Sequence, residues 1–167
     1  MIARTVVIGL GSPLMGDDGA GLAALDILRT EWTLEGVELV DGGTWGMSLL
    51  PIIEDADRVV LLDAIKAAAA PGEIVVLERE RLPIYLSRKL SPHEVDLRDV
   101  LALAELRGTL PVETVAIGVQ PTVVELGTEL SPAVVNALEP LVDAVVARLE
   151  QWGHVCAPVV PAVTCTR

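Results

Sequence analysis

Five short apolar runs, separated by loops and by segments of helical spacing such as residues 21–29, constrain the fold more than any other feature. The runs are rich in valine, isoleucine and leucine, and they lie at residues 5–9, 37–40, 58–64, 73–77 and 112–119. Continuous apolar runs are typical of strands that are buried on both faces of a sheet. The pattern predicts an α/β fold, a three-layer sandwich with helices on both faces of a mostly parallel, five-stranded, twisted sheet.

Caps and prolines predict where two of the helices begin. Ser91 and Glu94 form a capping box, with a proline between them at the first helical position. Ser131 and Pro132 repeat the combination of cap and proline and predict the start of the last helix. Pro140 falls inside that helix, so we expect a kink there.

The length of the chain, 167 residues, suits a single domain. We expect residues 1–152 to form one α/β domain and residues 153–167 to form an extended C-terminal tail, because the tail has prolines and no period. Cys156 and Cys165 both lie in this tail. Two cysteines are too few for a disulfide framework or for a four-cysteine metal site.

The composition excludes several classes of protein. A net charge of −12 argues against nucleic acid or an anionic membrane as a partner. No apolar run approaches the roughly 18 residues that a membrane-spanning helix needs. The N-terminus leads into the first predicted strand without the layout of a signal peptide. We therefore expect a cytoplasmic protein that does not insert into membranes.

The basic stretch at residues 79–98 is either a solvated surface or a face that a partner contacts.

Four acids stand at the ends of the predicted strands. Asp17 and Asp18 end the loop after the first strand, Asp41 ends the second, and Asp63 closes the third. In open α/β sheets, sites form at the carboxyl ends of the strands, so these carboxylates are candidates for one site. A carboxylate among valines and leucines, as at Asp63, is costly to bury unless it is paired, hydrogen-bonded or bound to a metal.

His93 is one of two histidines, and it falls in the first turn of a capped helix, from which it can reach the strand ends. Each candidate also has a structural explanation. Asp63 can bond a nearby loop, Asp18 can act as an N-cap, and His93 can be an exposed residue beside a cap. Two carboxylates and an imidazole that converge would make a three-ligand site with open positions, which suits nickel or zinc better than magnesium.

Other chemistries fit the sequence less well. Gly9 and Gly11 begin like a dinucleotide fingerprint, and Asp41 stands where an acid would bind a ribose hydroxyl. However, Leu14 replaces the third glycine, and the two acids at the following helix start would repel a pyrophosphate. His93 does not begin a zincin motif, and the chain has no G-x-S-x-G elbow.

Five motifs, in this order, resemble those of the hydrogenase maturation proteases. They are GLGSPLMGDDGAG at residues 9–21, DGGT at 41–44, DAI at 63–65, SPH at 91–93 and GVQP at 118–121. The similarity extends over about residues 6–149. The resemblance implies a three-layer fold around a mixed five-stranded sheet.

The resemblance also implies an endopeptidase. Its substrate would be the nickel-loaded precursor of the large subunit of a nickel–iron hydrogenase, from which it removes a C-terminal extension. The family's metal-contacting residues fall on Asp18, Asp63 and His93, and the metal they recognise is nickel held by the substrate's cysteines, with another divalent metal as the alternative. Many members have Glu where this chain has Asp18, so here the metal would sit deeper or be reached through water.

The same resemblance implies a substrate cleft lined by Gly42, Gly43 and Thr44. Asp41 is the acid of this cleft that is expected to take part in catalysis. Two other functions remain open from the sequence. One is a chaperone that senses nickel in the same precursor without cutting it, and the more distant one is a dinucleotide-dependent oxidoreductase.

Overall fold

The structure is a computed structural model that describes residues 3–43, 46–83 and 92–160, without the side chains of residues 92–96. Its strands are β1 (Thr5–Leu10), β2 (Trp32–Leu34), β3 (Val37–Gly43), β4 (Arg58–Ala64), β5 (Ile74–Glu78), β6 (Glu113–Val119) and β7 (Cys156–Pro158). Its α-helices are α1 (Ala20–Glu31), α2 (Leu50–Glu54), α4 (Pro92–Leu106) and α5 (Pro132–Gln151). Three short 3-10 turns are η1 (Gly16–Gly19), η2 (Gly46–Leu49) and η3 (Arg79–Arg81).

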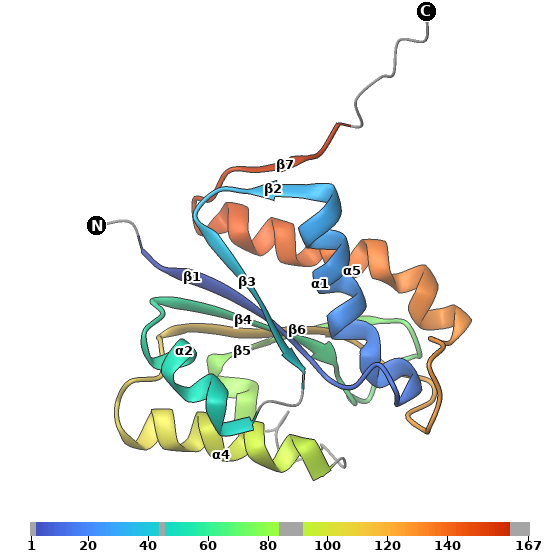
Figure 1. Cartoon of the computed structure of the whole chain (residues 1–167), viewed down its shortest axis with the longest axis horizontal. Coiled ribbons are helices and arrows are strands. Elements are labelled where there is room, and N and C mark those ends of the chain that lie inside the picture. Colours follow the sequence, from blue (N-terminus) through green and yellow to red (C-terminus); the bar gives the residue numbers. More distant parts are fainter. Residues whose placement is uncertain (1–2, 44–45, 84–91, 161–167) are drawn as a thin grey trace, which may run out of the picture.

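Five strands form one sheet in the order β3-β1-β4-β6-β5 (Figure 1). β3, β1, β4 and β6 run parallel, and β5 runs antiparallel to β6. The predicted mostly parallel, five-stranded α/β sheet is therefore confirmed. Each predicted strand is present, and the largest difference in bounds is at β3, which extends to Gly43.

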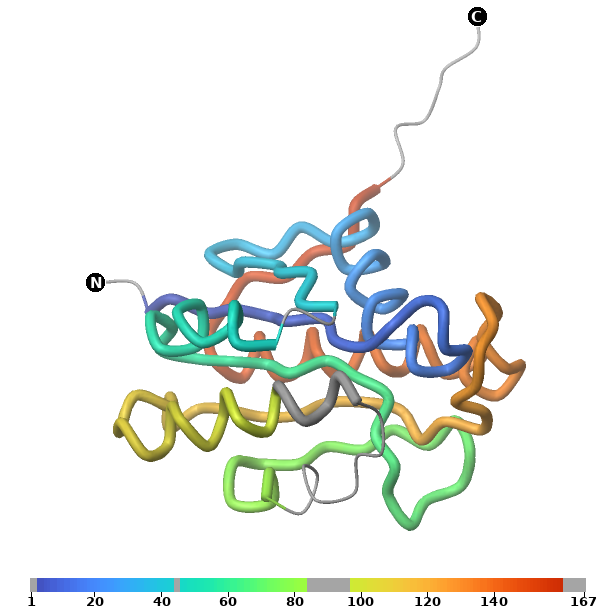
Figure 2. Tube along the Cα trace, turned by 60° about the horizontal axis from the view of Figure 1, so that its bottom comes forward, coloured from blue at the N-terminus to red at the C-terminus, as the bar shows by residue number. Residues whose placement is uncertain are grey.

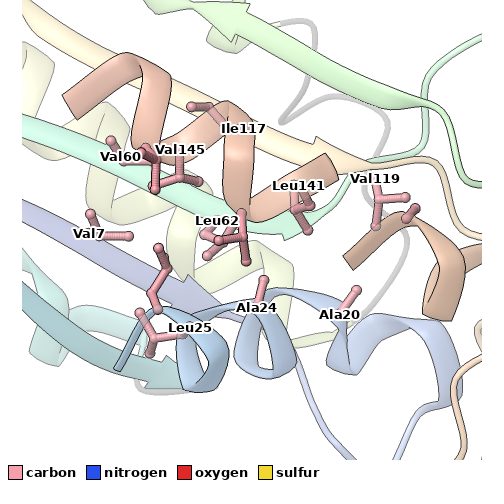
Figure 3. Close-up of a cluster of buried hydrophobic side chains, with 14 of the residues drawn as sticks. Val7, Ala20, Ala24, Leu25, Val60, Leu62, Ile117, Val119, Leu141 and Val145 are labelled. Atoms are coloured by element: carbon pink, nitrogen blue, oxygen red, sulfur yellow. The ribbon is translucent and has the colours of Figure 1, made fainter. Parts of the chain in front are cut away.

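Helices cover both faces of the sheet, with α1 and α5 on one face and α2 and α4 on the other (Figure 1). Alternate strand residues face the two layers. Val7, Val60 and Leu62 pack with α1 and α5 (Figure 3), whereas Ile8 and Leu61 pack with α2 and α4. All five side chains are fully buried. Burial on both faces explains why the strands read as continuous apolar runs.

The parallel strands end at one edge of the sheet, here termed the carboxyl edge, and begin at the opposite, amino edge. α4 has 15 residues and runs back toward the amino edge. The C-terminal end of α4 lies at the amino edge. Arg107, the residue after the helix, pairs there with Glu54 at the end of α2, with 3.1 Å between Nη1 and Oε1. The first turn of α4 therefore lies toward the carboxyl edge, and α4 contacts η2, the turn that follows β3.

The C-terminal region differs from the predicted extended tail. β7 pairs antiparallel with β2, so part of the tail belongs to a second, small sheet. His154 joins this region to the domain, since its Nδ1 lies 2.9 Å from the Glu35 carbonyl oxygen and its Nε2 lies 2.8 Å from Thr5 Oγ1. The predicted boundary after residue 152 thus falls within packed structure, and residues 161–167 lie outside the described part of the chain.

The predicted helix starts have different outcomes. α5 begins at Pro132 with Ser131 before it, as predicted, but the Ser131 hydroxyl donates to Asp17 instead of capping the helix. The helix continues through Pro140, and the kink stays a prediction. The capping box of Ser91 and Glu94 lies outside the described residues. Within the described ranges, no helix combines the length and apolarity needed to cross a bilayer.

Candidate active site at the carboxyl edge

Asp63 is fully buried near the carboxyl end of β4. Strand alternation gives it the same sheet face as Leu61, which is the face covered by α2 and α4. Its Oδ1 accepts a hydrogen bond of 2.8 Å from the Ala64 amide. The neighbouring strand β6 approaches Asp63 closely at Gly118, the residue with which Asp63 pairs. A Cβ on Gly118 would lie 2.3 Å from the Asp63 carbonyl oxygen.

Asp18 lies in η1, just beyond the end of β1, and is 6% exposed. The loop folds back on itself so that Asp18 Oδ2 accepts a hydrogen bond of 2.8 Å from the Ser12 amide. Gly11 makes this fold possible. Its φ is +104°, and a Cβ there would lie 1.9 Å from the Asp18 carbonyl oxygen. The Gly11 amide also donates to the Gly43 carbonyl at 3.1 Å, which ties the loop to the end of β3.

The first turn of α1 brings Asp18 and Asp63 to the same edge of the sheet. Gly21, at the start of α1, packs directly on the ends of β4 and β1, since a Cβ on it would lie 2.2 Å from the Leu62 carbonyl oxygen and 2.7 Å from the Leu10 carbonyl oxygen. Asp18 precedes this contact by one turn, and Asp63 follows Leu62 directly. Two buried carboxylates that are distant in sequence thus share one edge.

The remaining predicted metal ligand is partly described. His93 is the second residue of α4, whose first turn lies toward this same edge, but its side chain lies outside the described residues. Thr44, predicted to line the cleft, is also outside them. Among the residues that the structure describes, no three His, Cys, Asp or Glu side chains group as a metal site. The predicted three-ligand set therefore stays a prediction.

Asp41 lies on the edge strand β3 and is exposed. It pairs in register with Gly9, whose added Cβ would touch Leu25 of α1, so strand alternation gives Asp41 the α1 face of the sheet. Asp63 lies on the opposite face. The strand register shifts immediately after Asp41, where Gly42 is buried against Ile8. The structure thus brings Asp41 to the carboxyl edge without bringing it onto the face of Asp63.

Asp17 has a structural role that the sequence did not reveal. It is fully buried, and its carboxylate accepts four hydrogen bonds from a remote loop. The donors are the amides of Thr122 (2.8 Å), Val123 (3.0 Å) and Ser131 (2.6 Å) and the hydroxyl of Ser131 (2.9 Å). Burial raises the pKa of this carboxyl, but the hydrogen bonds outweigh burial and hold the pKa below its ordinary value. Asp17 is therefore a charged structural anchor.

Comparison with known proteins identifies the family of the chain. Residues 26–148 match the sequence profile of the hydrogenase maturation protease family. The chain belongs to this family. The protease is 34% identical over 157 residues to the hydrogenase 2 maturation protease of Escherichia coli, covering 93% of this chain and 96% of that one. It is 33% identical to a hydrogenase expression/formation protein, HupD, of Rhodobacter capsulatus, covering 90% and 73%.

Solved structures agree with the sequence relatives. The protease resembles the hydrogenase maturating endopeptidase HybD of E. coli with a TM-score of 0.87 and 34% identity, covering 93% of this chain and 97% of that one. It also resembles the [NiFe] hydrogenase maturation protease HybD of Thermococcus kodakarensis, with a TM-score of 0.68 and 30% identity, covering 86% and 97%. The protease is accordingly a hydrolase, an endopeptidase of hydrogenase maturation, and its three-layer fold is that of the family.

Among the residues that the structure describes, the ion pairs between segments distant in sequence gather at the amino edge, away from the two buried carboxylates. They join Arg4 to Glu38 and Asp55, Arg58 to Glu113, Arg79 to Glu105, Arg107 to Glu54, and Arg148 to Glu78. Arg79 belongs to the basic stretch noted in the sequence, and its pair with Glu105 favours the interpretation of a surface residue there. At the carboxyl edge, Lys66 is exposed just after β4. The buried carboxylates there make that edge suitable for a cation.

Proposed function

We propose that the protease removes the C-terminal extension from the nickel-loaded precursor of the large subunit of a nickel–iron hydrogenase, in the cytoplasm. Membership of the hydrogenase maturation proteases supports the reaction and the class of substrate. The observation that carries the metal-dependent part is the pair of buried carboxylates, Asp18 and Asp63, at one edge of the sheet. Each carboxylate accepts a backbone hydrogen bond, and both lie at the carboxyl ends of the strands, where sites form in open α/β sheets.

Asp18, Asp63 and His93 would recognise nickel as part of the substrate. The helical spacing of α4 supports a place for position 93 on the sheet face of Asp63. Position 93 lies one turn before Leu97, which is buried on the sheet face that Asp63 shares. Carboxylate and imidazole donors that leave coordination positions open would let the ion keep its bonds to the precursor. A nickel-free precursor would lack this anchor, so cutting would wait for metal insertion.

The cleft formed by Asp41, Gly42, Gly43 and Thr44 would hold the peptide to be cut. Asp41 is exposed on an edge strand, so both water and a peptide can reach it. As an aspartyl-type base, it would take a proton from water as the oxygen attacks the peptide carbonyl. The proton would then pass to the leaving amine as the peptide bond breaks, and the nickel of the substrate, held at the same carboxyl edge, would stabilise the oxyanion in between.

A mass measurement tests this proposal. The protease is mixed with nickel-loaded precursor and, separately, with nickel-free precursor, and the mass of the large subunit is followed. We expect loss of the extension in the loaded sample alone. Equal cutting of both would contradict metal sensing, and an unchanged mass with a stable complex would indicate a non-cleaving chaperone.

In the same assay, the variants His93→Ala and Asp41→Asn should not cut the precursor, while their thermal unfolding temperatures stay close to that of the wild type. Full activity in either variant would remove that residue from the proposal.

A further inference from the structure

Two loops at the carboxyl edge are joined into one unit. Residues 11–19 follow β1 and residues 120–131 follow β6, and the two segments lie side by side in both views (Figures 1 and 2). The Gly16 amide donates to the Gly127 carbonyl at 2.8 Å, and the Gly127 amide donates to the Leu14 carbonyl at 2.9 Å. The buried Asp17 carboxylate adds its four bonds to the second loop. These bonds fix the backbone of both loops.

This fixed unit holds apolar side chains in solvent. Leu14 is 59% exposed, Val123 is 38% exposed and Leu126 is 85% exposed. We name these three residues the apolar ridge. The bond between Gly127 and Leu14 brings the two leucine-bearing segments together. Because the backbone is fixed, the side chains cannot turn into the core without breaking several hydrogen bonds. An exposed apolar group on a rigid support is typical of an interaction site.

The surroundings of the ridge indicate what it would bind. Glu125 and Glu129 are exposed in the second loop, and neither loop contains a lysine or an arginine. The ridge also shares a loop with the candidate site, since Asp18 follows Leu14 by four residues. A matching partner therefore offers an apolar segment with basic side chains beside it, at a place that brings the partner next to Asp18.

We infer that the apolar ridge is the surface on which the precursor docks, through an apolar segment flanked by lysine or arginine. The inference rests on the proposed function for the identity of the partner. Ridge side chains would bury apolar surface on binding but would not touch the reacting atoms. Loss of the ridge should therefore weaken binding and raise KM, while kcat stays unchanged.

The test compares two double variants of the full-length protease. Leu14→Asp with Leu126→Asp places charges on the ridge. Leu106→Asp with Val112→Asp is the matched control, because these side chains are 84% and 79% exposed at the amino edge. All four positions are exposed, so thermal unfolding should change little. Affinity for nickel-loaded precursor and the steady-state constants of cutting are measured for each protein.

We expect the ridge variant to bind the precursor at least about tenfold more weakly and to raise KM by a similar factor, as loss of a buried anchor does. The control should behave as the wild type. Equal binding by both variants would overturn the inference, and so would a fall in kcat at unchanged KM. If the wild type binds the precursor without cutting it, the proposed function fails, but the binding comparison still decides the role of the ridge.

Discussion

Asp17 and Asp18 are adjacent and chemically identical, yet they serve different ends. The Asp17 carboxylate accepts four hydrogen bonds that hold residues 122–131, whereas the Asp18 carboxylate accepts one from Ser12 at the carboxyl edge, near Asp63. The sequence could not distinguish them, because the partners of Asp17 lie more than 100 positions away. The burial of Asp63 was predictable, because a lone acid in an apolar strand is a local signal.

Replacing the Asp17 anchor should destabilise the protease. Asp17→Asn removes the charge and puts an amide group against donors that it cannot all satisfy. We expect a loss of about 2–4 kcal/mol in the free energy of unfolding, since the bonds are buried and charge-assisted. Urea unfolding measures it. Asp26→Asn, on the exposed side of α1, is the control and should change stability by less than about 0.5 kcal/mol. If Asp17→Asn also changed the free energy of unfolding by less than about 0.5 kcal/mol, the role of Asp17 as an anchor would be contradicted.

The same anchor predicts a dependence on pH. The folded-state pKa of Asp17 lies below its ordinary value of about 4, so its ionised form stabilises the fold above that pH. As the pH falls below about 4, the unfolded state takes up the proton first and this contribution is lost. The stability difference between wild type and Asp17→Asn should therefore shrink from pH 6 toward pH 2. A constant difference would mean that the charge has no part in it.

At the scale of elements, the site depends on how closely α1 approaches the sheet. Gly21 is the contact point, because its Cα lies against the carbonyl oxygens of Leu62 and Leu10. Only a residue without a Cβ fits there, so this glycine fixes the position of Asp18 relative to the end of β4. The sequence shows the glycine, but only the packing shows why it is needed.

Gly21→Ala should destabilise the protease, contrary to the usual effect of alanine in a helix. In a free helix, alanine is favoured over glycine by about 1 kcal/mol. Here the added Cβ would meet backbone oxygens, so we expect a net loss of about 1–3 kcal/mol and slower cutting, because the ends of α1 and β4 must separate. Gly127→Ala is the stability control, since a Cβ there would lie 4.0 Å from the Glu125 carbonyl oxygen, an ordinary contact distance. A more stable Gly21→Ala would contradict the close approach.

The elements differ in how well the sequence predicts them. The strands of the main sheet were predictable because burial on both faces leaves long apolar runs, as in β4. β2 and β7 were not predicted, because each has only three residues and their pairing joins segments that are far apart in the sequence. The sheet face on which Asp41 lies could not be predicted either, since it follows from the register of β3 against β1.

At the largest scale, the described charged groups differ between the two edges of the sheet. In the described part of the chain, arginine–carboxylate pairs between distant segments lie at the amino edge, and the buried acids lie at the carboxyl edge, where the apolar ridge also lies. The net charge of −12 is visible in the sequence, but this division is not, because it depends on the direction in which each strand runs. This division supports the proposal that the precursor and its nickel bind at the carboxyl edge.

The most direct test of the account asks whether Asp63 is the residue that detects nickel. Initial rates of cutting are measured by mass for wild type and Asp63→Asn, each with nickel-loaded and nickel-free precursor, and Asp26→Asn serves as the control. We predict that wild type and control prefer the loaded precursor by roughly a hundredfold or more, about 2.7 kcal/mol, and that Asp63→Asn loses this preference while remaining folded. A folded Asp63→Asn that keeps the full preference would contradict the account.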